Sequence, residues 1–224
     1  MNKQVVILGA GGHAEVVADI IEKSGDKVIR LLDNNDEIEK YKNTCSFIIA
    51  IGDNYLRKKL ATEFNYLKWY TAIHPSAQIG KNVKIECGSM IMAEVVVNPG
   101  ATIGNHTIIN TGAIVEHDNK IGNFVHISPR VVLGGTVTIG ECSHIGIGAS
   151  VSNNINITSN VVVGAGAVVV KNIEKRGTYV GVPAKELNAL MKMRDKSYEV
   201  YKSGGGIKEN KKYVTCRSYY GAVA

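Results

Sequence analysis

Residues 97–121 read VNPGATIGNHTIINTGAIVEHDNKI, and every sixth residue of this stretch, counted from its first, is aliphatic. The same spacing continues in both directions, so that Ile, Val or Leu occupies seventeen successive positions from Ile73 to Val169. The residue four places after each of these is small or β-branched, with one exception, Asn119, which follows Glu116-His117-Asp118. A fixed period over so many positions indicates a repeat architecture.

A period of six fits neither an amphipathic helix, which has apolar spacings of three and four, nor a half-buried strand, which has a spacing of two. Six-residue units, each a short strand and a turn, stack instead as a parallel β-helix. We expect each unit to bury its aliphatic residue inside and to turn at polar or glycine residues, as in Gly80-Lys81-Asn82 and Gly122-Asn123. The sequence therefore predicts an all-β hexapeptide domain over residues 71–185.

The segment before the repeats has a different pattern and is predicted to form a separate α/β domain over residues 1–70. Short apolar runs alternate with amphipathic stretches in a β-α-β-α-β order, which is half of a Rossmann fold. The strands are expected at Val5–Leu8, Val28–Leu32 and Phe47–Ile51, and the longer helices at Ala14–Glu22 and Asn54–Phe64.

A glycine-rich loop, Gly9-Ala10-Gly11-Gly12-His13-Ala14, joins the first expected strand to the first helix. It matches G-x-G-x-x-G/A, in which glycines let backbone N–H groups approach a phosphate at a helix N-terminus. Asp33 ends the second strand, where an acidic residue commonly binds a ribose hydroxyl. One half of the dinucleotide fold suits a mononucleotide, such as the UDP of a nucleotide sugar, better than NAD. A tight turn that binds nothing is the alternative interpretation.

Composition narrows the class of protein. No apolar run approaches the length that spans a bilayer, and residues 1–9 are typical of a first strand rather than of a signal peptide. The four cysteines form no CxxC pair, which indicates neither a zinc site nor a disulfide framework and favours a reducing cytoplasm. From Lys185 onward there are nine Lys or Arg against four Asp or Glu, so +5 of the net charge of +6 lies there. The chain before Lys185 carries only the remaining +1, which does not favour a nucleic-acid-binding surface there.

The last part of the chain, residues 186–224, departs from the repeat pattern. We interpret it as a basic C-terminal tail in which residues 186–193 can form a short helix. The Gly204-Gly205-Gly206 run and the lysine-rich stretch after it are typical of a flexible segment.

His117 is the strongest candidate for a catalytic side chain. It stands two places after an aliphatic position, in a turn, and should therefore project outward. A histidine beside a carboxylate such as Asp118 can have its tautomer fixed and its basicity raised, which suits a general base near neutral pH. The break in the small-residue register at Asn119 favours a functional group over a solvated turn residue. His74 and His106 lack such a context and are expected to face solvent.

These features together resemble one family. The N-terminal glycine loop, the uninterrupted hexapeptide run, residues 110–118 (NTGAIVEHD), residues 121–126 (IGNFVH) and a closing YVGVPAK at residues 179–185 are similar to the hexapeptide-repeat sugar acyltransferases. The resemblance is to the group that holds bacillosamine N-acetyltransferases and sialic acid O-acetyltransferases, and it covers about residues 1–185.

The resemblance implies a fold, an assembly and a set of site residues. The fold would be a small nucleotide-binding domain followed by a left-handed parallel β-helix with three six-residue units per coil, and the assembly a homotrimer. His117 would be the general base and Asp118 its carboxylate partner. The remaining implied contacts are His126, Ile147 and Ala165 for acetyl-CoA, and Gly11, Gly12, His13, Asp33, Asn34 and Gly52 for the nucleotide sugar.

With three units per coil, residues eighteen positions apart lie directly above one another. His126 and His144 would then stack, either as metal ligands or as the wall of a ligand-binding groove, and we assign His144 to the acetyl-CoA site with His126. Gly135 would lie one coil beyond His117. We expect its backbone N–H to be unobstructed and to stabilise the oxyanion that develops on a thioester.

The predicted function is transfer of an acetyl group from acetyl-CoA to an amino or hydroxyl group of a nucleotide-linked sugar, in bacterial surface glycan biosynthesis. No Ser or Cys nucleophile is needed, so Cys142 is interpreted as a packing residue, and no metal is expected. Sialic acid O-acetylation is one alternative. A metalloenzyme of the γ-carbonic anhydrase type would need three histidines on one zinc, whereas His117 and His126 lie half a coil apart. A non-catalytic sugar-nucleotide-binding β-helix is the third alternative.

Overall fold

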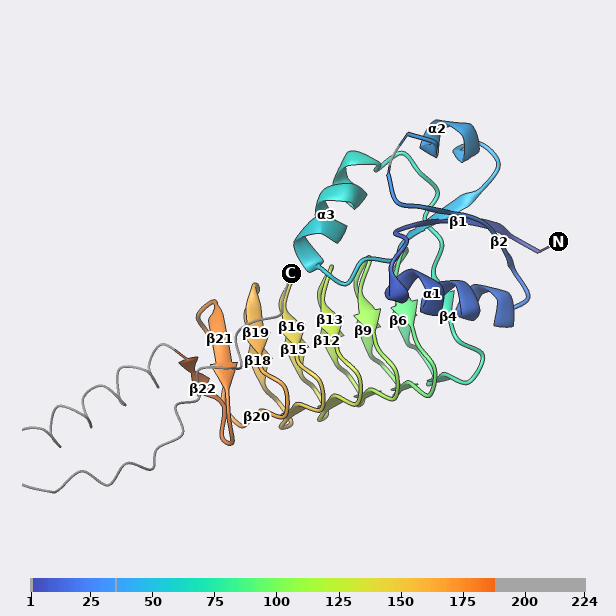
Figure 1. The fold of residues 1–224 in the computed structure, drawn as a ribbon. Coiled ribbons are helices and arrows are strands. Elements are labelled where there is room, and N and C mark those ends of the chain that lie inside the picture. Colours follow the sequence, from blue (N-terminus) through green and yellow to red (C-terminus); the bar gives the residue numbers. More distant parts are fainter. Residues whose placement is uncertain (1, 35, 188–224) are drawn as a thin grey trace, which may run out of the picture. The chain divides into compact units, whose positions relative to one another are not determined.

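A computed structural model of the chain describes residues 2–34 and 36–187 (Figure 1). The N-terminal part is a three-stranded parallel sheet in the order β2-β1-β3, with a helix after each strand. The three expected strands and the two expected helices are present, and a short helix for which the sequence suggested no range lies between β2 and β3. The elements are β1 (Gln4–Leu8), α1 (Gly12–Lys23), β2 (Lys27–Leu32), α2 (Ile38–Tyr41), β3 (Ser46–Ile49) and α3 (Asn54–Glu63).

The local sequence explains these elements. β1 and β3 are almost wholly apolar and almost wholly buried, as expected for strands covered on both faces. α1 buries Ala14, Val17, Ile20 and Ile21, which recur at helical spacing. α3 begins at an Asp53 cap, whose carboxylate accepts the backbone N–H of Leu56 at 2.7 Å.

The rest of the described chain is a parallel β-helix of short strands (Figure 1). Partner residues in neighbouring coils are eighteen positions apart, as in Ile108 with Met90 and with His126, which confirms three units per coil. The predicted fold class, an α/β half-Rossmann domain followed by a left-handed parallel β-helix, is thus confirmed.

The coils build three sheets, one on each side of the β-helix. The orders are β22-β21-β19-β16-β13-β10-β7-β4, β20-β17-β14-β11-β8-β5 and β18-β15-β12-β9-β6. The strands are β4 (Ala72–Ile73), β5 (Gln78–Ile79), β6 (Lys84–Ile85), β7 (Met90–Ile91), β8 (Val96–Val97), β9 (Thr102–Ile103), β10 (Ile108–Ile109), β11 (Ile114–Val115), β12 (Lys120–Ile121), β13 (His126–Ile127), β14 (Val132–Leu133), β15 (Thr138–Ile139), β16 (His144–Ile145), β17 (Ser150–Val151), β18 (Asn156–Ile157), β19 (Val161–Val163), β20 (Val168–Val169), β21 (Gly177–Val180) and β22 (Lys185–Glu186).

The turns explain why the repeat has six residues. One residue in every six, from Asn82 to Gly166, has a positive φ, and each stands three places after an aliphatic position. This left-handed residue reverses the chain between two short strands and sends the next aliphatic side chain back inside. The aliphatic residues are buried from Ile91 to Val169, whereas Ile73 and Ile79 in the first coil are 37% and 39% exposed.

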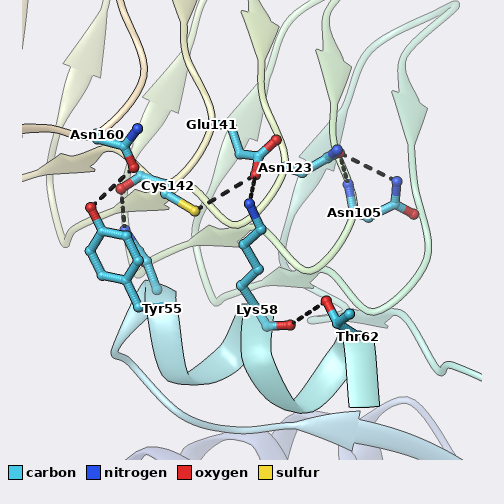
Figure 2. Close-up of polar contacts among 9 residues, drawn as sticks. Tyr55, Lys58, Thr62, Asn105, Asn123, Glu141, Cys142 and Asn160 are labelled. Atoms are coloured by element: carbon cyan, nitrogen blue, oxygen red, sulfur yellow. Dashed lines mark hydrogen bonds and ion pairs between the residues drawn. The ribbon is translucent and has the colours of Figure 1, made fainter. Parts of the chain in front are cut away.

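Helix α3 contacts the turns of the β-helix through a set of polar bonds (Figure 2). Tyr55 donates its hydroxyl hydrogen to Asn160 Oδ1 at 3.0 Å, and Lys58 pairs with Glu141. Between these exposed contacts lies Arg57, which is fully buried. Its guanidinium donates to the carbonyls of residues 51, 52, 106, 124 and 125 and to an Asn54 oxygen, so one side chain links the α/β domain to two turns of the β-helix.

The expectation that His106 faces solvent is wrong. Its ring is buried, lies parallel to Phe124 at 5.4 Å between centroids, and meets the edge of Trp69 at 4.7 Å. Burial, with a smaller contribution from the charge of Arg57, lowers the pKa of His106 to about 4. The stack on Phe124 could have been predicted, because Phe124 stands eighteen positions after His106, whereas Trp69 precedes the repeats and its contact with His106 follows from no repeat spacing.

The C-terminal end of the described chain adds one antiparallel pair. β21 continues the eight-stranded sheet and pairs with β22, so Glu186, the first residue of the expected short helix, belongs to a strand. The remainder of the predicted basic tail, residues 188–224, lies outside the described residues. Within residues 2–34 and 36–187, no helix has the length and apolarity required to cross a membrane.

Candidate active site

His117 lies in the turn after β11, and its side chain is 58% exposed. Its Nδ1 is 2.8 Å from Asp118 Oδ2, so the carboxylate accepts the Nδ1 hydrogen and leaves Nε2 as the proton acceptor. Asp118 is the left-handed residue of this turn, with φ of 59°, and its backbone N–H donates to the Pro99 carbonyl. The predicted pair of base and carboxylate partner is thus brought together on a fixed turn.

Asn119 explains the break in the small-residue register. Its side chain points into the β-helix, where it is fully buried. Its Nδ2 donates to the carbonyls of Glu116, at 2.6 Å, and Gly134, at 3.0 Å, and its Oδ1 accepts the N–H of Val137 at 3.0 Å. One polar residue in the apolar column therefore ties the turn that carries His117 to the next coil.

Gly135 lies directly against the imidazole, as the eighteen-residue offset predicts. A Cβ added there would be 2.5 Å from His117 Nε2, so only glycine leaves room for the ring. The expectation of an unobstructed N–H is wrong, however. The Gly135 N–H donates to Asn153 Oδ1 at 3.2 Å. Asn153 was not among the predicted site residues, although its position eighteen residues after Gly135 could have indicated it.

His126 and His144 stack as predicted, with ring centroids 4.7 Å apart and planes within 6°. His126 Nδ1 lies 3.3 Å from the Gly52 carbonyl, which makes Nδ1 the donor, and the His13 ring lies 6.5 Å from the His126 ring. Burial, followed by the neighbouring His144, lowers the pKa of His126 to about 3, so the ring is neutral at physiological pH. The structure thus brings together His13, Gly52, His126 and His144.

Polar neighbours hold this stack in place. Asn110 Nδ2 is 3.2 Å from His126 Nε2, and Ser128 Oγ is 2.8 Å from His144 Nε2. His13 Nε2, by contrast, is buried without a hydrogen-bond partner among the described residues. Across those same residues, no three His, Cys, Asp or Glu side chains are arranged to hold a metal ion.

A cavity of about 610 Å³ lies at the carboxyl ends of the strands of the α/β sheet. Of the predicted nucleotide-sugar residues, Gly11, Asp33 and Asn34 line it, whereas Gly12, His13 and Gly52 do not. A Cβ added at Gly11 or Gly12 would meet nothing within 4 Å, so the fold itself does not require glycine at either position. The other lining residues, Leu8, Gly9, Ala10, Leu32, Asp36, Ile51, Leu56 and Leu60, come from β1, β2 and the loops and helix around them.

Ile147 and Ala165 lie in successive coils, where the Gly166 N–H donates to the Ile147 carbonyl at 2.8 Å. Both are exposed, Ile147 at 60%. They follow β16 and β19 of the eight-stranded sheet, whereas His117 follows β11 of the six-stranded sheet. One chain therefore carries its predicted base and its predicted acetyl-CoA contacts at different corners of the coil.

Comparison with known proteins adds two family matches. Residues 4–64 match the PglD N-terminal domain, and residues 82–117 match the bacterial transferase hexapeptide family of six repeats. The chain is 37% identical over 112 residues to the UDP-N-acetylbacillosamine N-acetyltransferase of Bacillus subtilis (strain 168), an alignment that covers 41% of the chain and 52% of that protein. The chain thus spans about half the length of this curated relative.

Solved structures match over nearly their whole length. The acetyltransferase domain of PglB from Neisseria gonorrhoeae FA1090 is 33% identical, with a TM-score of 0.79 over 83% of this chain and 100% of that one. PerB from Caulobacter crescentus, in complex with CoA and GDP-perosamine, is 36% identical, with a TM-score of 0.79 over 82% of this chain and 96% of that one. The PglB domain has also been solved with acetyl coenzyme A.

Proposed function

The chain belongs to the sugar acetyltransferases of the hexapeptide-repeat group, and from this membership we propose that it transfers an acetyl group from acetyl-CoA to the amino group of a nucleotide-linked sugar. The observation that carries the proposal is the His117–Asp118 pair beside Gly135. It offers an oriented Nε2 on an exposed side chain, next to Gly135, which has no side chain of its own, and this arrangement suits deprotonation of a bulky acceptor.

The reaction needs one proton acceptor and one oxyanion donor. The sugar amine attacks the thioester carbonyl while His117 Nε2 takes a proton from the nitrogen. The developing oxyanion is stabilised by a backbone donor, for which the Gly135 N–H is our candidate. When the tetrahedral intermediate collapses, the C–S bond breaks and the CoA thiolate takes the proton from His117. Asp118 keeps its hydrogen bond to Nδ1 throughout, so the ring holds its orientation.

We assign the nucleotide of the acceptor to the cavity in the α/β domain. Gly11 lies at the N-terminus of α1, where backbone N–H groups favour a phosphate, and Asp33 is suited to a ribose hydroxyl. His13 Nε2, buried and without a partner among the described residues, lies outside this cavity and beside His126, so we do not assign it to the nucleotide. PerB was solved with a nucleotide-linked sugar, GDP-perosamine, which supports this substrate class.

We further propose a homotrimer in which acetyl-CoA lies between neighbouring β-helices, against the His126, His144, Ile147 and Ala165 column of one chain and the His117 corner of another. Two observations support this. The predicted donor contacts and the base occupy different corners of one chain. The outer face of the six-stranded sheet also carries an aliphatic row, Val96, Ile114 and Val132, in register across neighbouring strands.

The test is an acetyl-transfer assay on the purified chain with acetyl-CoA and a panel of acceptors, with the products identified by mass. The panel holds UDP-, GDP- and dTDP-linked amino sugars, counterparts with a hydroxyl in place of the amino group, and free sialic acid. We expect transfer to at least one nucleotide-linked amino sugar and none to the hydroxyl counterparts. Transfer to sialic acid alone would replace this proposal with O-acetylation, and a fully active monomer in sedimentation velocity would exclude the shared site.

A further inference from the structure

The backbone donor beside His117 is occupied in the structure. The Gly135 N–H donates to Asn153 Oδ1, and a Cβ at Gly134 would lie 2.1 Å from that same oxygen, so Gly134 is what lets Asn153 approach. We propose that Asn153 is a displaceable cap. Its Oδ1 satisfies the Gly135 N–H while the site is empty and gives way to the thioester oxygen during transfer. This inference rests on the proposed function and makes Asn153 a positioning residue for the same reaction.

Asn123 caps a backbone N–H of another turn in the same way, and the two caps differ in their number of hydrogen bonds. Asn123 Oδ1 accepts the backbone N–H of Asn105, eighteen residues earlier, at 2.8 Å, and also its side-chain Nδ2 at 3.3 Å (Figure 2). Asn123 and Asn153 both stand two places after an aliphatic position. Because Gly135 has no side chain, the Asn153 cap is one bond of 3.2 Å instead of two. It is therefore the more readily exchanged of the two.

The surroundings of Asn153 allow the exchange. Its side chain is exposed and can rotate into solvent, whereas Gly135 is buried. A buried N–H without an acceptor is costly, so the empty site needs a cap. An incoming carbonyl oxygen that replaces Oδ1 leaves the donor bonded at every stage. Asn153 thus keeps the oxyanion donor paired until a ligand takes it, and the ligand must displace one hydrogen bond to bind.

Two substitutions separate a cap from other roles. Asn153→Ala removes the competitor for the Gly135 N–H, and we expect KM for acetyl-CoA to fall about two- to tenfold with kcat retained, the range of one net hydrogen bond. Asn153→Asp keeps the shape but places a carboxylate on the donor. A charge-assisted bond is stronger and the negative charge opposes the oxyanion, so we expect kcat to fall about 10²-fold, as when an oxyanion donor is lost.

The matched control is Asn123→Ala, which removes the equivalent cap at a corner away from His117. We expect it to lower the melting temperature while leaving kcat and KM unchanged. The cap is supported when the Ala and Asp variants of Asn153 move in opposite directions. It is overturned if both lower kcat alike, which would make the Asn153 amide itself a substrate donor, or if both match the Asn123→Ala control.

The test remains decisive if no acceptor is turned over, an outcome that would remove the proposed function itself. Calorimetric titration with acetyl-CoA alone then compares the same variants. The cap predicts tighter binding for Asn153→Ala than for the wild-type chain and weaker binding for Asn153→Asp, and equal affinities would reject it. If acetyl transfer requires His117 but the Asn153 variants behave like the control, the cap proposal is rejected and the proposed function is retained.

Discussion

At the scale of single residues, the candidate site depends on the absence of side chains as much as on their presence. Gly135 leaves the space that the His117 ring fills, and Gly134 leaves the space for the Asn153 oxygen. Neither glycine has a positive φ, so both are required for steric reasons and not for backbone conformation. The sequence could indicate that a Gly-Gly pair stands one coil beyond the base and that Asn153 stands one coil beyond Gly135. It could not show that the Asn153 oxygen accepts the Gly135 N–H, because that bond depends on a side-chain rotamer.

The buried amide of Asn119 should matter to both stability and activity. Asn119→Ala would remove the hydrogen bonds that the amide makes to the Val137 N–H and to two backbone carbonyls. We therefore expect the free energy of unfolding to fall by about 2 kcal/mol or more, and the melting temperature by roughly 4–8 °C. We expect kcat to fall more than about tenfold, because the turn that carries His117 is no longer fixed. Thermal denaturation and steady-state kinetics measure the two effects.

The control for this substitution is Ser143→Ala. The Ser143 hydroxyl stands at the same position of another unit and also bridges two coils, donating to the Thr158 carbonyl and accepting the Val161 N–H. We expect a similar loss of melting temperature without the loss of kcat. If both variants lose activity to the same extent, Asn119 has a structural role only.

At the scale of elements, the loop before α1 contains two glycines, Gly11 and Gly12, that the fold itself does not require. Gly11 and Gly12 have open space where a side chain would go, and the loop borders the cavity that Asp33 also lines. The motif and the strand before it could be predicted from the sequence. His13 and Gly52 lie beside His126 instead of in this cavity. Their position could not be predicted, because it depends on how the α/β domain packs against the β-helix.

Gly12→Val should therefore weaken binding of the nucleotide sugar and leave binding of acetyl-CoA unchanged. A Cβ at Gly12 would meet no other atom within 4 Å, so we expect the fold to be retained, while close approach of a phosphate to the α1 N-terminus is blocked. We expect KM for the nucleotide sugar to rise at least about tenfold and the dissociation constant for acetyl-CoA to stay unchanged. Separate titrations with each ligand distinguish this result from equal weakening of both, which would assign the loop to the fold.

At the scale of the whole molecule, the repeat was the most predictable feature and the domain junction the least. Seventeen equally spaced aliphatic residues predict the β-helix, because burying them requires one turn per six residues. The junction depends on Arg57, whose buried charge is held by carbonyl groups and one amide, with no carboxylate among its hydrogen-bond partners in the described part of the chain. A lone arginine in a polar helix gives no sign of such a role in the sequence.

The same buried junction makes stability depend on pH. His106 and His126 have pKa values lowered to about 4 and about 3, against about 6.5 in an unfolded chain. Below pH 6.5 the unfolded state therefore binds more protons, so stability is complete above that pH and falls as the pH drops toward 4. We expect the melting temperature to fall over this window, and less steeply in His106→Asn. A melting temperature that is equal at pH 7 and pH 4.5 would contradict this account.

The most direct test of the central claim is the comparison of His117→Ala with the wild-type chain in acetyl transfer and in acetyl-CoA binding. Removal of a general base typically costs about 10²–10⁴ in rate. Because His117 is exposed and lies apart from the stacked histidines, we predict a loss of kcat in that range with an unchanged dissociation constant for acetyl-CoA and an unchanged melting temperature. A variant that keeps more than about a tenth of the wild-type kcat would show that His117 is not the base.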